Sequence, residues 1–244
     1  MHKEQLMFVN LLNRHFVSGG IGKPNILEIG SYDVNGSIRS IFEAESYVGV
    51  DLMCGPGVDV VASGHEISLE YESYDLAISC ECFEHNPYWR ETFINMIRHT
   101  KKDGIIAISC GSKGRREHGT KRTEPNESPG TQNVGLDYYK NLTEKDFVKN
   151  IELKKYFKKT LFYYSSSHRD LYFVGFMPLS KIDDNSIDLF INEVKSIDKK
   201  VENRTVVRRL ISSIYNAPIW VAMNILNDEG FQNFLINYRK LFRR

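Results

Sequence analysis

Two histidines are candidate catalytic residues because each follows an apolar, strand-like run. His85 lies in CFEHNPYW, after YDLAISC, and His118 lies in the polar stretch GRREHGT, after GIIAISCG. Histidine is the most frequent general base because its pKa lies near neutral. Glu81 and Glu84 flank His85 and could accept a proton or orient a histidine. We therefore expect His118 first, and then His85 and Glu81, to act on a hydroxyl nucleophile.

Each of these residues also has a simpler interpretation. A histidine in a polar loop can be solvated, as His118 would be, and a histidine at a helix start can cap or pack, as His85 would. Glu81, His85 and His118 could also share a divalent cation, although neighbouring carboxylates and histidines have many other uses. We assign no residue to a metal and keep a divalent cation as a secondary expectation.

The stretch NILEIGSYDVNG, residues 25–36, has the form of a ligand-binding loop between a strand and the next element. Gly30 permits a tight turn close to a ligand, and Gly36 would let a helix begin close to the sheet. Dinucleotide sites place a further glycine between these two, where backbone approaches a pyrophosphate. Tyr32 occupies that position. The loop therefore favours a nucleoside ligand without a diphosphate.

The next strand-like run, SYVGVD, ends in Asp51, about 20 residues after Gly30, the spacing at which an acidic residue reaches a ribose diol in this kind of fold. A carboxylate accepts two hydroxyl hydrogen bonds well. Glu28 ends the first strand and would lie near the polar tail of the ligand or near a cation. Without the preceding glycine loop, Asp51 could equally be an ordinary carboxylate in a turn at a strand end.

Apolar runs alternate with helical or loop segments along most of the chain, which predicts a largely parallel sheet covered by helices on both faces. Residues 111–139 are rich in polar, Gly and Pro residues and are long for a connector, which favours a functional loop. Arg115 and Arg116 in this loop could bind an anionic sugar, nucleotide or phosphate, or be solvated. We expect helices at 3–17, 36–44 and 86–102, after Thr143 and over most of 183–244, and strands at 25–30, 46–51, 57–62, 74–80, 104–111 and twice within 153–178.

The composition is that of an ordinary globular protein. The chain has 244 residues, with 41% hydrophobic and 26% charged residues. A net charge of +1 gives no electrostatic signal for nucleic acid. No apolar run is long enough to span a bilayer, and residues 1–16 lack the apolar core of a secretory signal. We therefore expect a cytoplasmic protein without a membrane span or a nucleic-acid partner.

Four stretches resemble the successive motifs of class I S-adenosylmethionine-dependent methyltransferases, in particular those similar to methyltransferase type 11. They are ILEIGSYDVNG, YVGVDLMCGPGVDVV, YDLAISCECFEHNPYW and TKKDGIIAISCG, and the resemblance covers roughly residues 24–178. The polar loop is also similar to that of a bacterial and viral subset often linked to surface-sugar genes. The resemblance implies a Rossmann-like, seven-stranded, mostly parallel sheet with helices on both faces, followed by a helical C-terminal extension.

The resemblance also implies a cofactor, S-adenosylmethionine, and residues to bind it. In this family an acidic residue and a glycine-rich loop hold the methionine part, and an acidic residue ends the second strand at the ribose. Tyr32, and KKDG in place of the commoner K-P-G-G turn, depart from the family pattern. The positions that match the cofactor-binding residues are Glu28, Gly30, Ser31, Gly36, Asp51, Leu52, Met53, Ala62, Ser63 and Cys80.

The expected activity is methyl transfer to oxygen on a small polar acceptor, such as a sugar, a sugar nucleotide or a surface-glycan precursor. Methylation of nitrogen on a small molecule and a non-catalytic, cofactor-binding partner subunit remain alternatives. An NAD-linked oxidoreductase is a further alternative, against which Tyr32 argues. We expect a methyltransferase domain at 1–180 and a helical extension at 181–244, which would form a lid or the contact of a homodimer.

Overall fold

Seven strands form one sheet in this protein. The computed structural model describes residues 2–198 and 206–241, without the side chains of 206–214. The strands are β1 (Asn25–Ile29), β2 (Ser46–Asp51), β3 (Val60–Val61), β4 (Tyr74–Cys80), β5 (Thr100–Gly111), β6 (Lys159–Ser165) and β7 (Asp170–Phe176).

The order of the strands confirms the predicted fold class. They lie in the order β3-β2-β1-β4-β5-β7-β6. The pairs among the first five are parallel, while β7 is antiparallel to both β5 and β6. The order reverses beside β1, because the chain runs from β1 out to β3 and then returns to β4 on the other side of β1. Ligands of open parallel sheets bind at the carboxyl ends of strands beside such a reversal.

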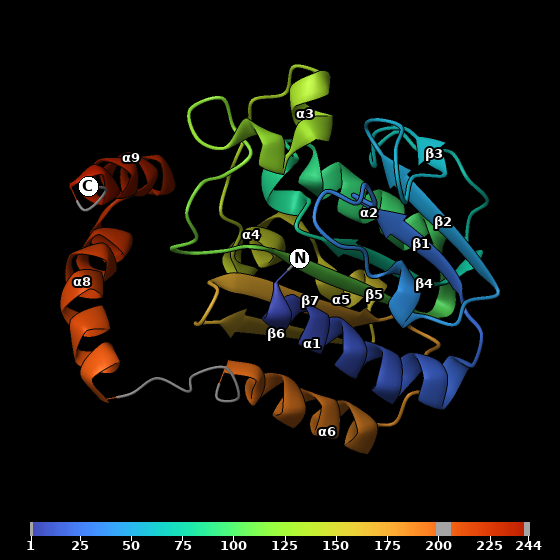
Figure 1. Cartoon of the computed structure of the whole chain (residues 1–244). Coiled ribbons are helices and arrows are strands. Elements are labelled where there is room, and N and C mark those ends of the chain that lie inside the picture. Colours follow the sequence, from blue (N-terminus) through green and yellow to red (C-terminus); the bar gives the residue numbers. More distant parts are fainter. Residues whose placement is uncertain (1, 199–205, 242–244) are drawn as a thin grey trace.

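One face of the sheet is covered by three helices and holds an aromatic core (Figure 1). Phe93 and Phe147 come from two of these helices, with ring centroids 5.5 Å apart, and Phe147 stacks on Phe173 of β7 at 5.9 Å. The second helix begins at a capping box, in which Thr143 and Asp146 satisfy each other's backbone N–H groups. The three helices are α2 (Trp89–His99), α4 (Glu144–Asn150) and α5 (Leu153–Tyr156).

The other face is covered by α1 (Lys3–Leu12), its π-helical continuation Asn13–Ile21, and α6 (Asp184–Lys195). Phe8 of α1 stacks on Tyr172 of β7 with centroids 4.5 Å apart. The predicted N-terminal helix is therefore confirmed, with a change of helix type in its second half. α6 packs into the same core as α1 and the sheet. The predicted domain boundary at residue 180 stays a prediction.

The helix predicted at 36–44 is wrong. Only the single turn Arg39–Ile41 is helical there. The guanidinium of Arg39 donates to the carbonyl of Tyr47 at 3.0 Å and to Asp59 at 2.9 Å, which ties this segment to the edge of the sheet. Gly36 therefore starts no helix.

Two other predicted elements are shorter than expected. The strand predicted at 57–62 forms only β3, and the helix predicted at 86–102 ends at His99, where β5 begins directly. Thr100 donates its hydroxyl to the carbonyl of Met96 at 2.8 Å and leaves the helix with an extended backbone. The β-branched residues that follow favour the strand.

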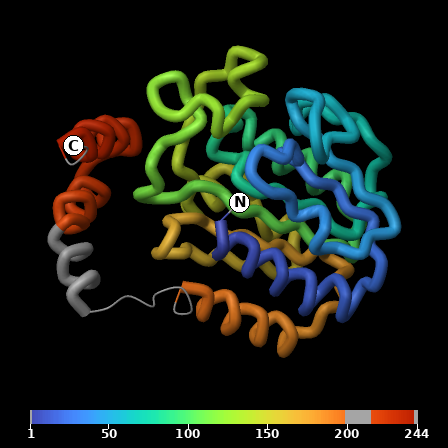
Figure 2. The backbone as a smooth tube through the Cα atoms, viewed as in Figure 1, coloured from blue at the N-terminus to red at the C-terminus, as the bar shows by residue number. Residues whose placement is uncertain are grey.

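The polar segment 111–139 lies over the sheet edge that carries the carboxyl ends of the parallel strands. It contains a turn at Pro125–Glu127 and the short helix α3 (Pro129–Asn133). Two further helices, α8 (Val206–Ile225) and α9 (Asp228–Lys240), stand to the side of the sheet, and α9 reaches this segment (Figure 2). Within the described part of the chain, no helix combines the length and apolarity needed to cross a membrane.

Candidate functional site

A cavity of about 480 Å³ opens at the carboxyl ends of β1, β2 and β4. Its floor is formed by the ends of these strands and the loops that follow them, including Ile29, Asp51 and Cys80. The segment 111–139 closes it from above. The parallel strands thus bring together loops that are far apart in the sequence, at the place where the strand order reverses.

The loop after β1 is shaped by Gly30. Its φ of +82° suits glycine, and a Cβ at this position would stand 2.5 Å from Cβ of Cys82. The N–H groups of Gly30 and Ser31 both donate to the carbonyl of Val50, at 2.9 and 3.1 Å. The loop is therefore tied to β2, and its backbone lies against the cavity.

Asp51 is held in place by this loop. Its carboxylate accepts the backbone N–H of Tyr32 at 3.2 Å and that of Leu52 at 2.7 Å. Burial raises the pKa of Asp51, and these backbone donors oppose that rise. Gly130 of α3 lies directly over the carboxylate, because a Cβ there would stand 2.7 Å from Oδ1 of Asp51. The polar segment therefore covers the carboxylate expected at the ribose.

Glu28 is an almost fully buried carboxyl group beside the cavity. The hydroxyl of Tyr47 donates to its Oε2 at 2.7 Å. Burial raises the pKa of Glu28 to about 7, and the hydrogen bond from Tyr47 opposes that rise. A group with this pKa is part neutral and part ionised near neutral pH, so a cationic ligand would draw it to the ionised form.

The cavity gathers almost all of the residues that we expected to bind a cofactor. The exception is Met53, which follows Leu52 but does not line the cavity. Gly36 lines it although it starts no helix. The ring of Tyr32 packs against Gly55 in the next loop, where an added Cβ would lie 2.0 Å from Cε2 of the tyrosine. The lining includes Glu28, Gly30, Ser31, Gly36, Asp51, Leu52, Ala62, Ser63 and Cys80.

The two predicted histidines meet in the lining of the same cavity. Nε2 of His85 lies 3.3 Å from Nε2 of His118, and the rings stand edge to face at 85°. Nδ1 of His118 lies 3.1 Å from the carbonyl of Arg116, to which it donates, so its Nε2 is an acceptor. Burial lowers the pKa of His85 to about 3 and also lowers the pKa of His118. Both imidazoles are therefore neutral near pH 7.

Glu81 also lines the cavity, but Arg115 binds it. Nη2 of Arg115 lies 3.5 Å from Glu81, and Nη1 lies 3.2 Å from Asp170, which is fully buried. Arg116 in turn pairs with Glu124 at 2.9 Å. Glu81 has a φ of +53°, which is uncommon for a residue other than glycine and turns the chain sharply after β4. These ion pairs form one wall of the cavity.

Three residues near the site were not expected from the sequence. His2 and Gln5 of the N-terminal helix line the cavity, and Gln5 donates to Ser109 at 2.9 Å. Gln232 of α9 is buried, accepts the N–H of Glu117 at 2.8 Å, and donates to the carbonyl of Arg115 at 2.8 Å. No local pattern marks these residues, because their roles depend on tertiary contacts.

Part of the chain matches a known protein family. Residues 37–108 match the family model described as a methyltransferase domain. Within these residues the chain resembles a methyltransferase domain. The matched segment runs from the loop after β1 to the middle of β5, and so includes Asp51 and His85. No curated protein sequence matches the chain.

Solved structures of methyltransferases resemble this fold at low sequence identity. The 1,6-didemethyltoxoflavin N1-methyltransferase of Burkholderia thailandensis has 13% identity and a TM-score of 0.48, over 72% of this chain and 79% of the other. The N-methyltransferase NodS of Bradyrhizobium japonicum has 14% identity and a TM-score of 0.45, over 72% and 96%. Phosphoethanolamine N-methyltransferase 2 of Haemonchus contortus has 16% identity and a TM-score of 0.43, over 78% of this chain and 47% of that one. These likenesses describe the fold and carry no argument about the acceptor.

The residues of the cavity fit the donor of this class of methyltransferase. Gly30 lets the backbone of the loop turn tightly against Cys82 and line the cavity. Asp51 offers hydrogen-bond acceptors for a diol, and the buried Glu28 offers a carboxyl group for an ammonium. The donor supplies a methyl group on a sulfonium, so the protein mainly has to bind and orient the two reactants.

Proposed function

We propose that this methyltransferase methylates a hydroxyl oxygen of a small polar acceptor, such as a sugar or a surface-glycan precursor. The supporting observation is that one cavity holds both Asp51 and the His85–His118 pair. The end near Asp51 suits the nucleoside, and the end near the histidines suits an acceptor. An acceptor between them would meet the donor and a proton acceptor at the same time.

In this proposal the residues around Asp51 position the donor. Asp51 binds the ribose hydroxyls, and Glu28 in its ionised form binds the ammonium of the methionine part. Leu52, Ala62 and Ser63 line the adenine end. The carbonyls and carboxyl groups on this side suit a sulfonium, which carries a positive charge until the methyl group leaves.

The histidine pair activates the acceptor. Nε2 of His118 takes the hydroxyl proton as the new carbon–oxygen bond forms and the carbon–sulfur bond breaks. In the free protein His85 donates its Nε2–H to Nε2 of His118 at 3.3 Å, so the acceptor hydroxyl must displace this hydrogen bond to reach the lone pair of His118. Glu81 acts through Arg115, which it holds against the acceptor side of the cavity. A base placed in this way contributes about 100-fold or more to the rate.

The charges on the acceptor side favour an uncharged acceptor. Arg115 and Arg116 line the cavity, but each is paired with carboxylates at 2.9 to 3.5 Å. A phosphate would have to break these pairs, while neutral sugar hydroxyls can use the carboxylates as hydrogen-bond acceptors. A neutral sugar or glycan therefore fits better than a sugar nucleotide.

Mass spectrometry tests the proposal directly. The protein would be incubated with a methyl donor that carries an isotopically labelled methyl group and with matched sugars, sugar nucleotides, small amines and catechols. We expect label on a sugar hydroxyl and weaker labelling of the sugar nucleotide. Label on the amines alone would instead identify a nitrogen acceptor.

A further inference from the structure

A buried carboxyl group lies beside the histidine pair, behind the lining of the cavity. Glu84 is fully buried, and its Oε1 accepts the backbone N–H of Gly111 at 2.8 Å. Its Oε2 has no hydrogen-bond partner. One ligand atom from each of Glu84, His85 and His118 lies within 4.8 Å of the other two. We propose that these three side chains bind a divalent transition-metal ion.

The geometry of the two imidazoles supports this assignment. Two ligand atoms bound to one ion at about 2.05 Å and at a tetrahedral angle lie about 3.3 Å apart. The Nε2 atoms of His85 and His118 are 3.3 Å apart. Because the rings are edge to face at 85°, their in-plane lone pairs can converge on one point between them.

The atoms around the pair also resemble those behind metal ligands. Histidines that bind a metal usually donate the other ring N–H to a backbone carbonyl or a carboxylate. Nδ1 of His118 makes such a bond to the carbonyl of Arg116. In the empty site Nε2 of His85 must carry the proton that lies between the rings. An ion would replace that proton, which would move to Nδ1 of His85, where the backbone of Tyr138 lies close enough to accept it.

The charges around Glu84 also favour a bound cation. Glu84 makes no ion pair with any described residue, and its burial, together with the nearby Glu81, raises its pKa well above the usual range. A divalent ion would remove the cost of ionising this buried carboxyl group. Two neutral imidazoles and one carboxylate favour zinc, manganese, iron or cobalt over magnesium or calcium, which prefer oxygen ligands alone.

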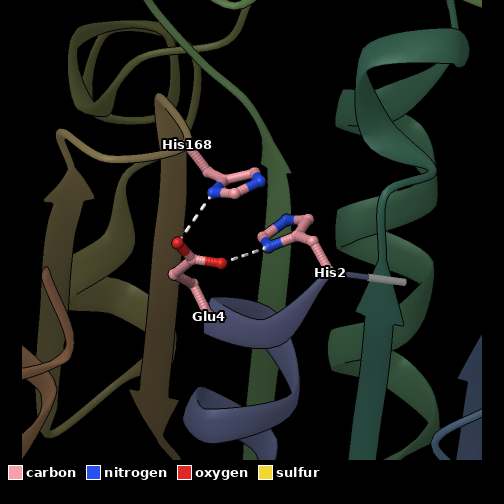
Figure 3. Close-up of side chains that lie close together, drawn as sticks. All are labelled: His2, Glu4 and His168. Carbon is pink, nitrogen blue, oxygen red and sulfur yellow. Dashed lines mark ion pairs between the residues drawn. The ribbon is translucent and has the colours of Figure 1, made fainter. Parts of the chain in front are cut away.

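A second group of possible metal ligands serves as a matched control for the proposed metal site. It consists of His2, Glu4 and His168, in which Nδ1 of His168 lies 2.8 Å from Glu4 and Nδ1 of His2 lies 3.4 Å from Glu4 (Figure 3). Its imidazoles stack with centroids 4.1 Å apart and planes within 10°. Their lone pairs therefore lie in separate parallel planes and do not converge. Nδ1 of His2 also accepts the N–H of Gln5 at 3.4 Å.

The ion would affect the acceptor, and this consequence rests on the proposed function. Three protein ligands leave at least one coordination position open toward the cavity, which His85 and His118 both line. A hydroxyl bound there has a lowered pKa. In the loaded protein the two imidazoles serve as ligands, so His118 no longer accepts the proton, and the bound hydroxyl releases it to water in the open cavity.

Metal binding can be measured without the donor or the acceptor. The full-length protein, stripped with a chelator, would be dialysed against Co²⁺ or Zn²⁺, and bound metal would be counted by mass spectrometry. Visible absorption of Co²⁺ would report its ligands. We expect one ion per chain, and an affinity at least about 100-fold lower in both His118→Ala and Glu84→Gln. The variant His168→Ala should keep the affinity of the unmodified protein.

The outcomes separate this proposal from the proposed function. An unmodified protein that binds no stoichiometric ion would overturn the metal site, and so would binding that survives in His118→Ala but is lost in His168→Ala. A thermal shift with S-adenosylmethionine would show that each variant is folded and still binds the donor. Methyl transfer by chelator-treated protein at an unchanged rate would also overturn the metal site, while it would leave the proposed function intact.

Discussion

Nε2 of His85 and Nε2 of His118 lie 3.3 Å apart, although 33 residues separate them in the chain. His85 follows β4, and His118 lies in the polar segment after β5. The two strands are parallel neighbours, so both residues leave the sheet at the same edge. The fold thus joins two histidines in the lining of the cavity that also holds Asp51.

Replacing His118 with Ala should lower kcat by about 100-fold or more, because the acceptor hydroxyl loses the group that activates it. The Kd for S-adenosylmethionine should stay unchanged, since His118 is not among the residues proposed to bind the donor. Steady-state kinetics and calorimetry measure the two effects. His15→Gln is a suitable control, because His15 contacts Glu193 on the far side of the sheet. Equal kcat values in the two variants would remove His118 from the mechanism.

The affinity for the donor should depend on pH through Glu28. Its pKa of about 7 means that the group is protonated at lower pH and cannot attract an ammonium. Between about pH 6 and about pH 8, affinity for S-adenosylmethionine should rise by about tenfold. Glu28→Gln should abolish this dependence. Tyr47→Phe should move it to higher pH, because the hydrogen bond from Tyr47 holds the pKa of Glu28 down.

The same group predicts the pH dependence of the free protein's stability. The folded pKa of Glu28 is raised above the unfolded value, so the folded state binds more protons in the window between the two. The free energy of unfolding should therefore decrease as pH rises from about 4.5 to about 7. Denaturant titrations of the unmodified protein and of Glu28→Gln would test this. A difference between the two proteins that does not change with pH would contradict the assigned pKa.

Gln232 should act as a positioning residue for the segment that carries His118. Its amide spans Arg115 and Glu117, at 2.8 Å to each backbone group. Gln232→Ala should lower kcat and raise KM for the acceptor, while the affinity for the donor stays unchanged. It should also cost about 1–3 kcal/mol of stability. The matched control is Asn233→Ala, which removes only an exposed contact to Arg122. Identical kinetics in both variants would show that α9 does not position this segment.

Gly30 should tolerate no side chain. An alanine there combines a φ of +82° with a Cβ placed 2.5 Å from Cβ of Cys82. We expect Gly30→Ala to destabilise the protein by about 2 kcal/mol or more and to weaken donor binding. Gly20→Ala serves as the control, because nothing lies within 4 Å of its added Cβ. That variant should be neutral or slightly stabilised. A similar Tm for the two variants would contradict the account of this loop.

The central strands, and the place of most of the expected cofactor-binding residues in one cavity, were predictable from the sequence. β1, β4 and the second half of β5 are short apolar runs that lie buried in the middle of a parallel sheet. Their length and the turn residues that bound them identify such runs as strands. Asp51 was predictable because its spacing from Gly30 reflects one strand–loop–strand unit. The predicted helix at 36–44 failed because Arg39 makes hydrogen bonds to β2 and to Asp59. Such long-range bonds override local propensity.

The acceptor end was predictable only in part. The sequence indicated His85 and His118 separately, but their contact depends on how the polar segment folds back over β4. Gln232 belongs to a helix at the end of the chain and has no sequence pattern that links it to Arg115. Met53, expected at the adenine, lies outside the cavity because the chain turns away after Leu52.

A crystal structure with S-adenosylhomocysteine, the product of the donor, would test the central claim most directly. We predict that its ribose hydroxyls lie within hydrogen-bond distance of Asp51, with its sulfur directed toward the cavity end that holds His85 and His118. Density for the ligand at another place, or a ribose that makes no contact with Asp51, would contradict the account.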